Sequence, residues 1–392
     1  MNNLTADYGF CSLNHAGEQL CGDRVEVLEQ PDGGLIAVLA DGLGSGVKAN
    51  ILATLTSKII STMLAAGLTL TDCVETIAST LPICKERGVA YSTFTILRIL
   101  PGELASLIQY DNPEVILLRD GKSIDYPSET ITVGGKDILR SDLVLKEGDQ
   151  LIALSDGCLY AGTEIGLNMG WKRDDIIDFM ETFEGVGFTS KTLATMLADK
   201  CDELYAGSPS DDVTAFVVQM RRRQQVNVMV GPPEKPENDA MMLSRFFAEE
   251  GLHVVSGGTT ANIAARWLGK ELRTVKTRDG DEDIPPVAEL PGADLVTEGI
   301  ITIHRVLEYA KNYLGPNDLY VKWGYQKDGA ALLARLLFEE ATDIHFFIGR
   351  AVNAAHQMTN GLPFNFDIKM HLMEELIDCL RKMGKRVTAE YF

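Results

Sequence analysis

The chain has 392 residues, of which 45% are hydrophobic and 23% are charged. This length exceeds what one hydrophobic core usually supports, so we expect two domains of an ordinary folded protein. The formal net charge of -20 excludes nucleic acid and anionic membranes as partners, because phosphate backbones and acidic lipids repel such a surface.

The seven cysteines form no Cys-x-x-Cys pair, which favours free thiols in a reducing cytoplasm. The N-terminal residues lack the basic and apolar regions of a signal peptide. No apolar run approaches the roughly 20 residues that span a bilayer. We therefore expect a cytoplasmic protein without a membrane segment.

Residues 1–40 alternate short strand-like runs with turns, which predicts antiparallel hairpins. The apolar run 34–40 ends in Asp41, and three glycines occur in the next five positions. Apolar residues at helical spacing follow over 47–64, so Asp41 is predicted on a strand-to-helix turn. A carboxylate beside uncovered backbone carbonyls suits a hard divalent cation. The alternative is a plain Asp-Gly turn whose side chain bonds only its own backbone.

The pattern downstream predicts a mixed domain. Helices are expected at 47–66, 71–81, 173–183 and 191–205, and strands at 90–154 and 213–220. Runs of strands with helices in pairs predict two packed antiparallel sheets flanked by helices.

Acidic turns recur at three further places, each at the end or the start of a strand-like run. They are Gly22-Asp23-Arg24, Ser155-Asp156-Gly157 and Ser210-Asp211-Asp212. Together with Asp41 they predict one clustered acidic site. Because close carboxylates repel one another, a pair of divalent metal ions is the natural neutraliser, and this arrangement suits phosphoryl-group hydrolysis.

In this order and at these separations, the acidic motifs resemble the SpoIIE-like branch of the metal-dependent, PPM-type protein serine/threonine phosphatases. Three further segments are similar to that branch, namely a central strand at 92–97, a proline-containing hairpin at 110–121 and a turn at 145–149. The resemblance covers roughly residues 1–220. It implies an α+β fold, a four-layer α-β-β-α sandwich with the metal ions at one end of the sheets.

The resemblance also assigns the site. Asp41 would bridge two Mn or Mg ions with help from the Gly42 carbonyl. The remaining ligands, direct or through water, would be Asp23, Asp156 and Asp211. Asp212, beside the last ligand, ranks below these four. A metal-bridging hydroxide would then attack the phosphorus of a phosphoserine or phosphothreonine.

One departure from broader relatives concerns the phosphate. No arginine shortly precedes Asp23, where many members hold the substrate phosphate. Lys48, in the first turn after the glycine-rich loop, is a candidate replacement because a phosphate is stabilised near helix amides and a lysine. The alternative is a solvated surface lysine.

A polar, basic interruption at 221–225 is predicted to link the domain 1–220 to a second domain, 226–392. Strands are expected at 226–230, 253–256, 294–296 and 345–348. Helices are expected at 237–250, 257–268, from 300, at 329–340, directly after 345–348, and at the end of the chain. This alternation predicts a separate α/β domain with a mostly parallel sheet and helices on both faces.

The second domain resembles no family that we recognise, and its site is predicted from topology. Loops after three of its strands would gather at the edge where such sheets bind ligands. Their candidate residues for an anionic small molecule are Gly257, Gly258, Thr259, Thr260 and Glu298. The glycines and threonines offer amides, hydroxyls and a helix N-terminus to a phosphate or carboxylate, and ordinary helix capping is the alternative. Arg350 would add positive charge or form a surface salt bridge.

We therefore predict a bacterial phosphoserine/phosphothreonine protein phosphatase that regulates signalling or transcription. The resemblance implies a phosphorylated protein substrate such as an anti-sigma factor antagonist, and the second domain would sense a small molecule or position this substrate. One alternative is a catalytically silent phosphatase-fold scaffold whose second domain binds a small anionic ligand. Another is that the second domain is itself an enzyme. The oligomeric state, a homodimer included, is left open.

Overall fold

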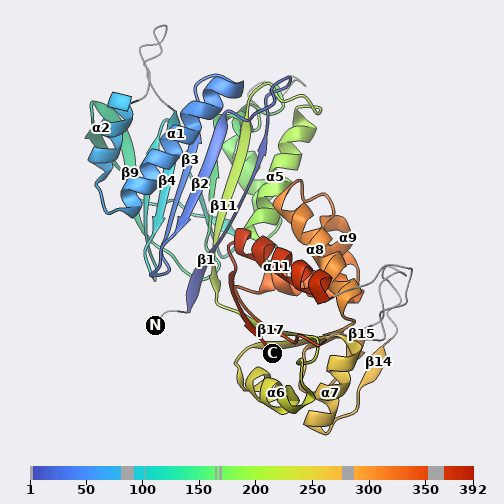
Figure 1. The fold of residues 1–392 in the computed structure, drawn as a ribbon. Helices are drawn as coiled ribbons and strands as arrows, with labels where there is room; N and C mark the ends of the chain where they lie inside the picture. Colours follow the sequence, from blue (N-terminus) through green and yellow to red (C-terminus); the bar gives the residue numbers. More distant parts are fainter. Residues whose placement is uncertain are drawn as a thin grey trace. The chain divides into compact units, whose positions relative to one another are not determined.

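In a computed structural model of the chain, the structure describes residues 3–80, 92–101, 103–163, 166, 170–275, 287–351 and 366–392. The helix predicted directly after 345–348 lies outside these residues, as do residues 81, 90 and 91 at the ends of two predicted segments. The chain divides into two compact units, Met1–Arg222 and Arg223–Phe392 (Figure 1).

The first unit contains a six-stranded antiparallel sheet in the order β2-β3-β4-β5-β9-β8. Its strands are β2 (Asp23–Glu29), β3 (Leu35–Asp41), β4 (Thr93–Ile99), β5 (Leu104–Tyr110), β9 (Lys136–Val144) and β8 (Glu129–Val133). Helices α1 (Gly46–Ala65) and α2 (Leu70–Thr80) cover one of its faces.

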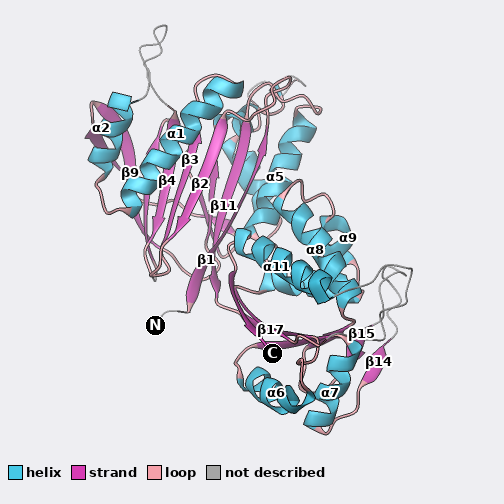
Figure 2. Ribbon diagram, viewed as in Figure 1, coloured by secondary structure: helices cyan, strands magenta, loops and turns pink. Residues whose placement is uncertain are grey.

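A five-stranded antiparallel sheet in the order β1-β11-β10-β6-β7 completes the first unit. Its strands are β1 (Leu4–Leu13), β11 (Val213–Arg222), β10 (Gln150–Leu154), β6 (Ile116–Arg119) and β7 (Lys122–Ser123). Helices α3 (Asp156–Tyr160), α4 (Arg173–Glu181) and α5 (Ser190–Leu204) pack on it. Figure 2 shows α1 and α5 beside their sheets.

Strand β3 explains how the layers are joined. Its residues Leu35, Ala37 and Leu39 belong to a core that also contains Leu151 and Phe216 of the other sheet. The intervening side chains on β3 pack instead with α1 and α2. Because successive side chains of a strand point to opposite faces, an apolar run such as β3 is buried on both.

The strands of the first unit continue beyond the predicted boundary. Arg221 and Arg222 extend β11 because the partner strand β1 still offers Thr5 and Leu4 for pairing. Strand β12 already begins at Gln225, so only residues 223–224 lie between the strands, where the sequence suggested a linker over 221–225.

The second unit is built on a seven-stranded sheet in the order β14-β15-β16-β13-β12-β17-β18. The strands are β14 (Arg273–Val275), β15 (Val287–Glu289), β16 (Leu295–Thr297), β13 (Leu252–Ser256), β12 (Gln225–Val230), β17 (Asp343–Ile348) and β18 (Arg386–Tyr391). The five strands from β16 to β18 are parallel, and β14 and β15 join the sheet antiparallel.

Helices cover both faces of this sheet, as Figure 1 shows. A 3-10 turn (Pro236–Asn238), α6 (Asp239–Ala248) and α7 (Gly258–Leu268) lie on one face. The other carries α8 (Ile300–Leu314), α9 (Tyr320–Tyr325), α10 (Gly329–Arg335), a π-helical turn (Leu336–Glu340) and α11 (Phe366–Lys382). The helix predicted at 329–340 is thus α10 followed by the π-helical turn.

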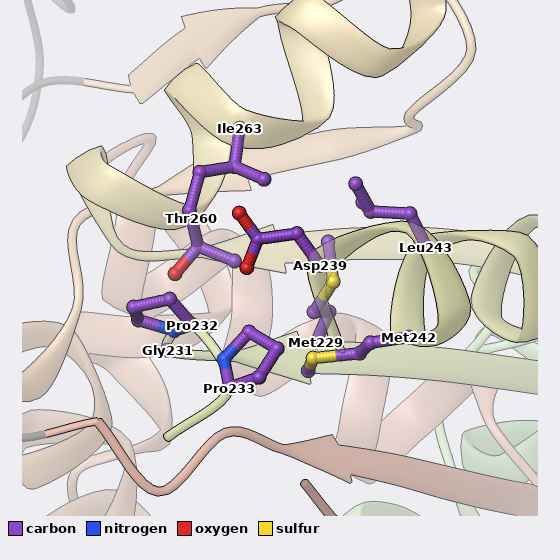
Figure 3. Close-up of a pocket in the computed structure, with 9 residues that line it drawn as sticks. All are labelled: Met229, Gly231, Pro232, Pro233, Asp239, Met242, Leu243, Thr260 and Ile263. Carbon is purple, nitrogen blue, oxygen red and sulfur yellow. The ribbon is translucent and has the colours of Figure 1, made fainter. Parts of the chain in front are cut away.

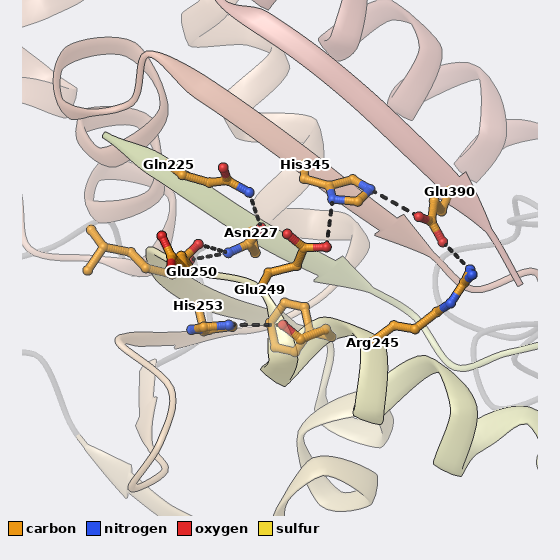
Figure 4. A network of polar contacts seen from close by, with 10 residues as sticks. Gln225, Asn227, Arg245, Glu249, Glu250, His253, His345 and Glu390 are labelled. Atoms are coloured by element: carbon orange, nitrogen blue, oxygen red, sulfur yellow. Dashed lines mark hydrogen bonds and ion pairs between the residues drawn. The ribbon is translucent and has the colours of Figure 1, made fainter. Parts of the chain in front are cut away.

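A polar network fixes the end of α6 on the sheet (Figure 4). His345 on β17 lies between Glu249 and Glu390, with nitrogen-to-oxygen distances of 3.9 and 3.6 Å. Arg245 of α6 approaches Glu390 to 2.7 Å. The fully buried Asn227 of β12 donates to the backbone oxygen of Glu250 at 2.9 Å. This donation explains why a polar residue is tolerated inside a parallel strand.

Candidate metal centre

Two of the predicted aspartates face each other across neighbouring strands. Asp23 is the first residue of β2 and Asp41 the last of β3, and the two are register partners. Asp41 also pairs with Thr93 at the start of β4. A glycine must follow Asp41 because a Cβ at Gly42 would lie 2.1 Å from the carbonyl oxygen of Ala49.

The other two aspartates come from the second sheet. Asp156 is the first residue of α3, directly after β10, and Asp211 lies shortly before β11. The Ser155 hydroxyl accepts a hydrogen bond from the Thr214 amide at 2.8 Å, which ties the Asp156 turn to the start of β11. A Cβ on Gly157 would lie 2.1 Å from the backbone oxygen of Asp212, so the turns are in close backbone contact.

A cavity of about 390 Å³ collects these elements. It is lined by His15, Asp41, Gly42, Leu43, Gly44, Ser45, Thr93, Asp156, Ser210 and Asp211. Three of the four predicted aspartates therefore share one cavity. The fourth, Asp23, is only 4% exposed and does not line the cavity. Its charge acts on Asp41, the residue opposite it on β3.

The carboxylates are short of positive charge. Burial raises the pKa of Asp41 to about 9, and repulsion from Asp23, Asp156 and Asp211 adds to this shift. Burial likewise raises the pKa of Asp23 to about 7. The pKa values of Asp156 and Asp211 are also raised, mainly by burial. Without a cation the site can keep its acidic groups together only by holding protons.

The donor set fits divalent cations. The Ser155 and Thr214 hydroxyls lie near the buried Asp23 carboxylate and offset part of the rise in pKa that burial causes, but neither of its oxygens has a hydrogen-bond partner of good geometry in the part of the chain that the structure describes. Such oxygens are the ligands that Mg²⁺ and Mn²⁺ prefer. In the same part, no three His, Cys, Asp or Glu side chains are close enough to hold one ion as they stand. Three of the four candidate ligands therefore line one cavity, without the side-chain arrangement, among the described residues, that would hold one ion.

Asp212 has a different position from the four aspartates. It is 3% exposed, and one of its carboxylate oxygens accepts a hydrogen bond from the backbone amide of His15 at 3.0 Å. It does not line the cavity. Asp212 therefore holds the loop that carries His15.

His15 is a functional candidate that the sequence analysis missed. Its Nδ1 lies 2.9 Å from the Ala16 carbonyl oxygen, and its charge acts on Asp211. Among the residues that line the cavity, it alone carries a side chain that can become positive. Lys48, the predicted phosphate anchor, is exposed and is not among those lining residues. The only sequence signal for His15 is its turn, eight residues before Asp23.

A family model described as stage II sporulation protein E (SpoIIE) matches residues 31–221, all within the first unit. After this match, we call the first unit the SpoIIE domain. The match confirms the resemblance seen over roughly residues 1–220, and the second unit remains unidentified. No curated protein sequence matches the chain.

Solved structures similar to the chain are phosphatase domains and related regulators. The phosphatase domain of SpoIIE from Bacillus subtilis is 20% identical, covering 57% of this chain and 95% of that one, with a TM-score of 0.42. The RsbU and RsbW domains of Rv1364c from Mycobacterium tuberculosis are 18% identical over 62% and 70% of the two chains, with a TM-score of 0.47. The SiaA-PP2C domain of Pseudomonas aeruginosa is 18% identical over 54% and 85%, with a TM-score of 0.42. Similarity at this level says nothing about activity.

The candidate residues outside the SpoIIE domain lie at the carboxyl ends of the parallel strands of the second unit. Gly257 to Thr260 form the loop after β13 and the first turn of α7, and Glu298 follows β16. The structure brings these two loops into contact. Arg350 follows β17, is exposed, and lies over the ring of Tyr391 at 5.3 Å.

In the described ranges, no helix is long and apolar enough to cross a bilayer.

Proposed function

We propose that the SpoIIE domain is a metal-dependent phosphoserine/phosphothreonine protein phosphatase that acts in bacterial signalling or transcription control. The observation that carries this proposal is the cavity lined by Asp41, Asp156 and Asp211, with the buried Asp23 opposite Asp41 on the neighbouring strand. We propose also that the two sheets and their helices form the four-layer sandwich of this family.

Two Mn or Mg ions would be held by Asp23, Asp41, the Gly42 carbonyl, Asp156 and Asp211. When bound, these ions would lower the pKa of water and neutralise phosphate oxygens. The carboxylates stay in place because strand ends and glycine-bearing turns fix their backbones.

The remaining cavity residues would receive the substrate. Gly42, Gly44 and Ser45 line the cavity just before α1, and the amides at the N-terminus of this 20-residue helix attract an anion. The Glu18 carboxylate lies beside Gly46, the first residue of α1, and a substrate phosphate would compete with it there. His15 directs Nδ1 toward the Ala16 carbonyl, so Nε2 is the nitrogen left for the substrate, and the imidazolium form of the ring would protonate the departing serine or threonine oxygen from Nε2. The cavity volume of about 390 Å³ is in the range of small-molecule sites and admits a phosphorylated side chain.

The substrate would be a phosphorylated regulatory protein, such as one similar to an anti-sigma factor antagonist. With a net charge of -20, the chain attracts partners that present basic surface near the phosphorylated residue. The second unit would sense a small molecule or position this substrate. The described residues offer no observation that favours the silent scaffold or an enzyme in the second unit.

The test is hydrolysis of p-nitrophenyl phosphate and of a phosphothreonine peptide by the full chain with Mn, with Mg and with chelator. Turnover should require metal and should fall about 100-fold or more in Asp41→Asn, because one ligand carboxylate is lost. Asp178→Asn, at an exposed position of α4, is the matched control and should retain activity. Absence of turnover with either metal, or full activity of Asp41→Asn, would overturn the proposal.

A further inference from the structure

The parallel strands of the second unit have an order that creates a ligand crevice. Numbered along the chain, β12, β13, β16, β17 and β18 lie in the order 3-2-1-4-5 across the sheet. The order reverses at β12, and sheets of this kind bind ligands beyond the carboxyl ends of the strands near such a point. The loops that begin at Gly231, Gly257, Glu298 and Gly349 all lie at this edge.

Two helix N-termini converge there without caps. Helix α7 has 11 residues and α8 has 15, and their N-cap residues are Gly257 and Gly299. Neither helix has a side-chain cap or an acidic residue in its first turn. A Cβ on Gly299 would lie 3.4 Å from the Cα of Gly257. Backbone amides at the start of both helices, with the positive ends of both helix dipoles, therefore meet in one place.

Two buried hydroxyls in the first turns of these helices lack partners. Thr260 of α7 is 3% exposed and Thr302 of α8 is fully buried. Neither hydroxyl has a hydrogen-bond partner in the part of the chain that the structure describes. Thr260 borders a cavity of about 10 Å³ that Gly231, Pro232 and Asp239 also line. In Figure 3 the Thr260 oxygen points toward the Gly231 loop, and the Asp239 carboxylate lies beside Thr260. The space admits one oxygen-sized group.

The carboxylate of Glu298 occupies the position between the two helices. One of its oxygens accepts a hydrogen bond from the Gly299 amide at 2.7 Å. The other lies 3.4 Å from where a Cβ on Gly258 would be. Glu298 is half-buried, and no cationic side chain in the described ranges pairs with it. A single bond to the next residue along the chain leaves this carboxylate free to swing out.

A half-buried lysine, Lys369, lies on the other side of the Gly231 loop. The Lys369 ammonium donates to the Gly349 carbonyl oxygen and lies 2.1 Å from the place of a Cβ on Gly231. No carboxylate in the described ranges pairs with it, and burial lowers its pKa to about 8. An anionic ligand that extends from Thr260 past Gly231 would place a negative charge near the Lys369 ammonium.

We propose that the second unit binds a phosphorylated small molecule at this edge, with its phosphate at the paired N-termini of α7 and α8 in the position that Glu298 occupies without ligand. Glu298 is then an internal competitor that leaves when the ligand binds. The proposal is independent of the phosphatase reaction, and it gives the second unit a ligand class of its own.

The probe is inorganic phosphate, and its binding to the full chain is measured by calorimetric titration. EDTA removes divalent ions, so that the uncompensated carboxylates of the SpoIIE domain disfavour phosphate binding there. Glu298→Gln keeps an acceptor for the Gly299 amide but removes the competing charge, so it should lower the Kd about tenfold or more. Glu374→Gln, at an exposed position of α11, is the matched control and should bind like the unaltered chain.

Thr260→Val is a near-isosteric change that tests the site independently, and it should weaken phosphate binding both alone and together with Glu298→Gln. The proposal fails if Glu298→Gln binds no tighter than the control, or if Thr260→Val has no effect.

Discussion

Asp23 shows at the level of one residue why the acidic site calls for cations. It is 4% exposed, and both of its carboxylate oxygens lack hydrogen-bond partners in the described residues. A buried charge without a partner destabilises a protein by several kcal/mol. Burial and the neighbouring aspartates Asp212 and Asp156 raise its pKa more than the Ser155 and Thr214 hydroxyls lower it, and protons or metal ions would relieve the remaining repulsion. His15 is the residue that we propose as proton donor to the substrate.

His15→Gln should separate proton donation from phosphate binding. Glutamine still forms hydrogen bonds but cannot protonate an alkoxide. We expect kcat/KM for a phosphothreonine peptide to fall about 100-fold. With p-nitrophenyl phosphate the loss should stay within roughly threefold, because p-nitrophenolate leaves without a proton. His304→Gln, at an exposed position of α8, should change neither. Equal losses on both substrates would contradict the acid role.

At the level of elements, the site depends on strand-to-helix turns that touch one another through glycines. The turns at Gly22, Gly42 and Gly157 each leave no room for a Cβ. Their near neighbours are the Asp212 carboxylate and the backbone of Ala49 and Asp212. Asp41 and Asp156, beside Gly42 and Gly157, are thereby set by backbone contact, which varies less than side-chain packing. Gly22, in the loop before β2, is instead close to side-chain atoms of Asp212 and Ala49.

Gly157→Ala should test this contact. The new Cβ would lie 2.1 Å from the Asp212 carbonyl oxygen, so the turn that carries Asp156 must move. Overpacking of this kind destabilises a protein by about 1–3 kcal/mol, and we expect weaker Mn binding as well. Urea unfolding and Mn titration measure the two effects. Gly315→Ala, where the nearest atom is 3.6 Å away, should leave both unchanged. Unaltered stability of Gly157→Ala would contradict the argument.

The whole chain is strongly acidic, and its candidate metal site brings several of the acidic side chains close together. Its net charge is -20, and several of the carboxylates are held inside the SpoIIE domain rather than on its surface. The metal-free chain should therefore become less stable as pH rises and these groups lose their protons. Divalent ions should reverse this dependence.

In the folded, metal-free chain the pKa of Asp23 is about 7 and that of Asp41 about 9, whereas both lie near 4 in an unfolded chain. The folded state keeps protons that the unfolded state loses between about pH 4 and pH 9. The free energy of unfolding should therefore fall as pH rises through this window. Thermal unfolding with EDTA at pH 5 and pH 8 measures the effect, and Mn should restore the Tm at pH 8.

Asp23→Asn should raise the Tm of the metal-free chain at pH 8 by roughly 3 °C, because it removes a buried charge. It should also reduce the stabilisation by Mn. Asp178→Asn should follow the unaltered chain in both conditions. A metal-free chain whose Tm rises from pH 5 to pH 8 would contradict this account.

Much of the fold could be predicted because it is encoded locally. The apolar run before Asp41 and the helical spacing after it are properties of adjacent residues, and β3 and α1 form there. The strand and helix alternation after residue 225 likewise predicted a mostly parallel sheet. Strand β18 was missed, because its short pattern of exposed and buried residues at the sheet edge differs little from that of a loop.

The sequence by itself determined which residues form the acidic motifs, because their order and spacing are visible without a fold. Only the tertiary structure decided what these motifs meet. The contact of His15 with Asp212 joins residues 197 positions apart, and the approach of Gly257 to Gly299 depends on two strands lying side by side. Hydrophobic periodicity records which face of an element is buried, whereas register and sheet order arise from packing between distant segments. For this reason the sequence predicted the four aspartates, and the fold revealed His15 and the converging helix N-termini.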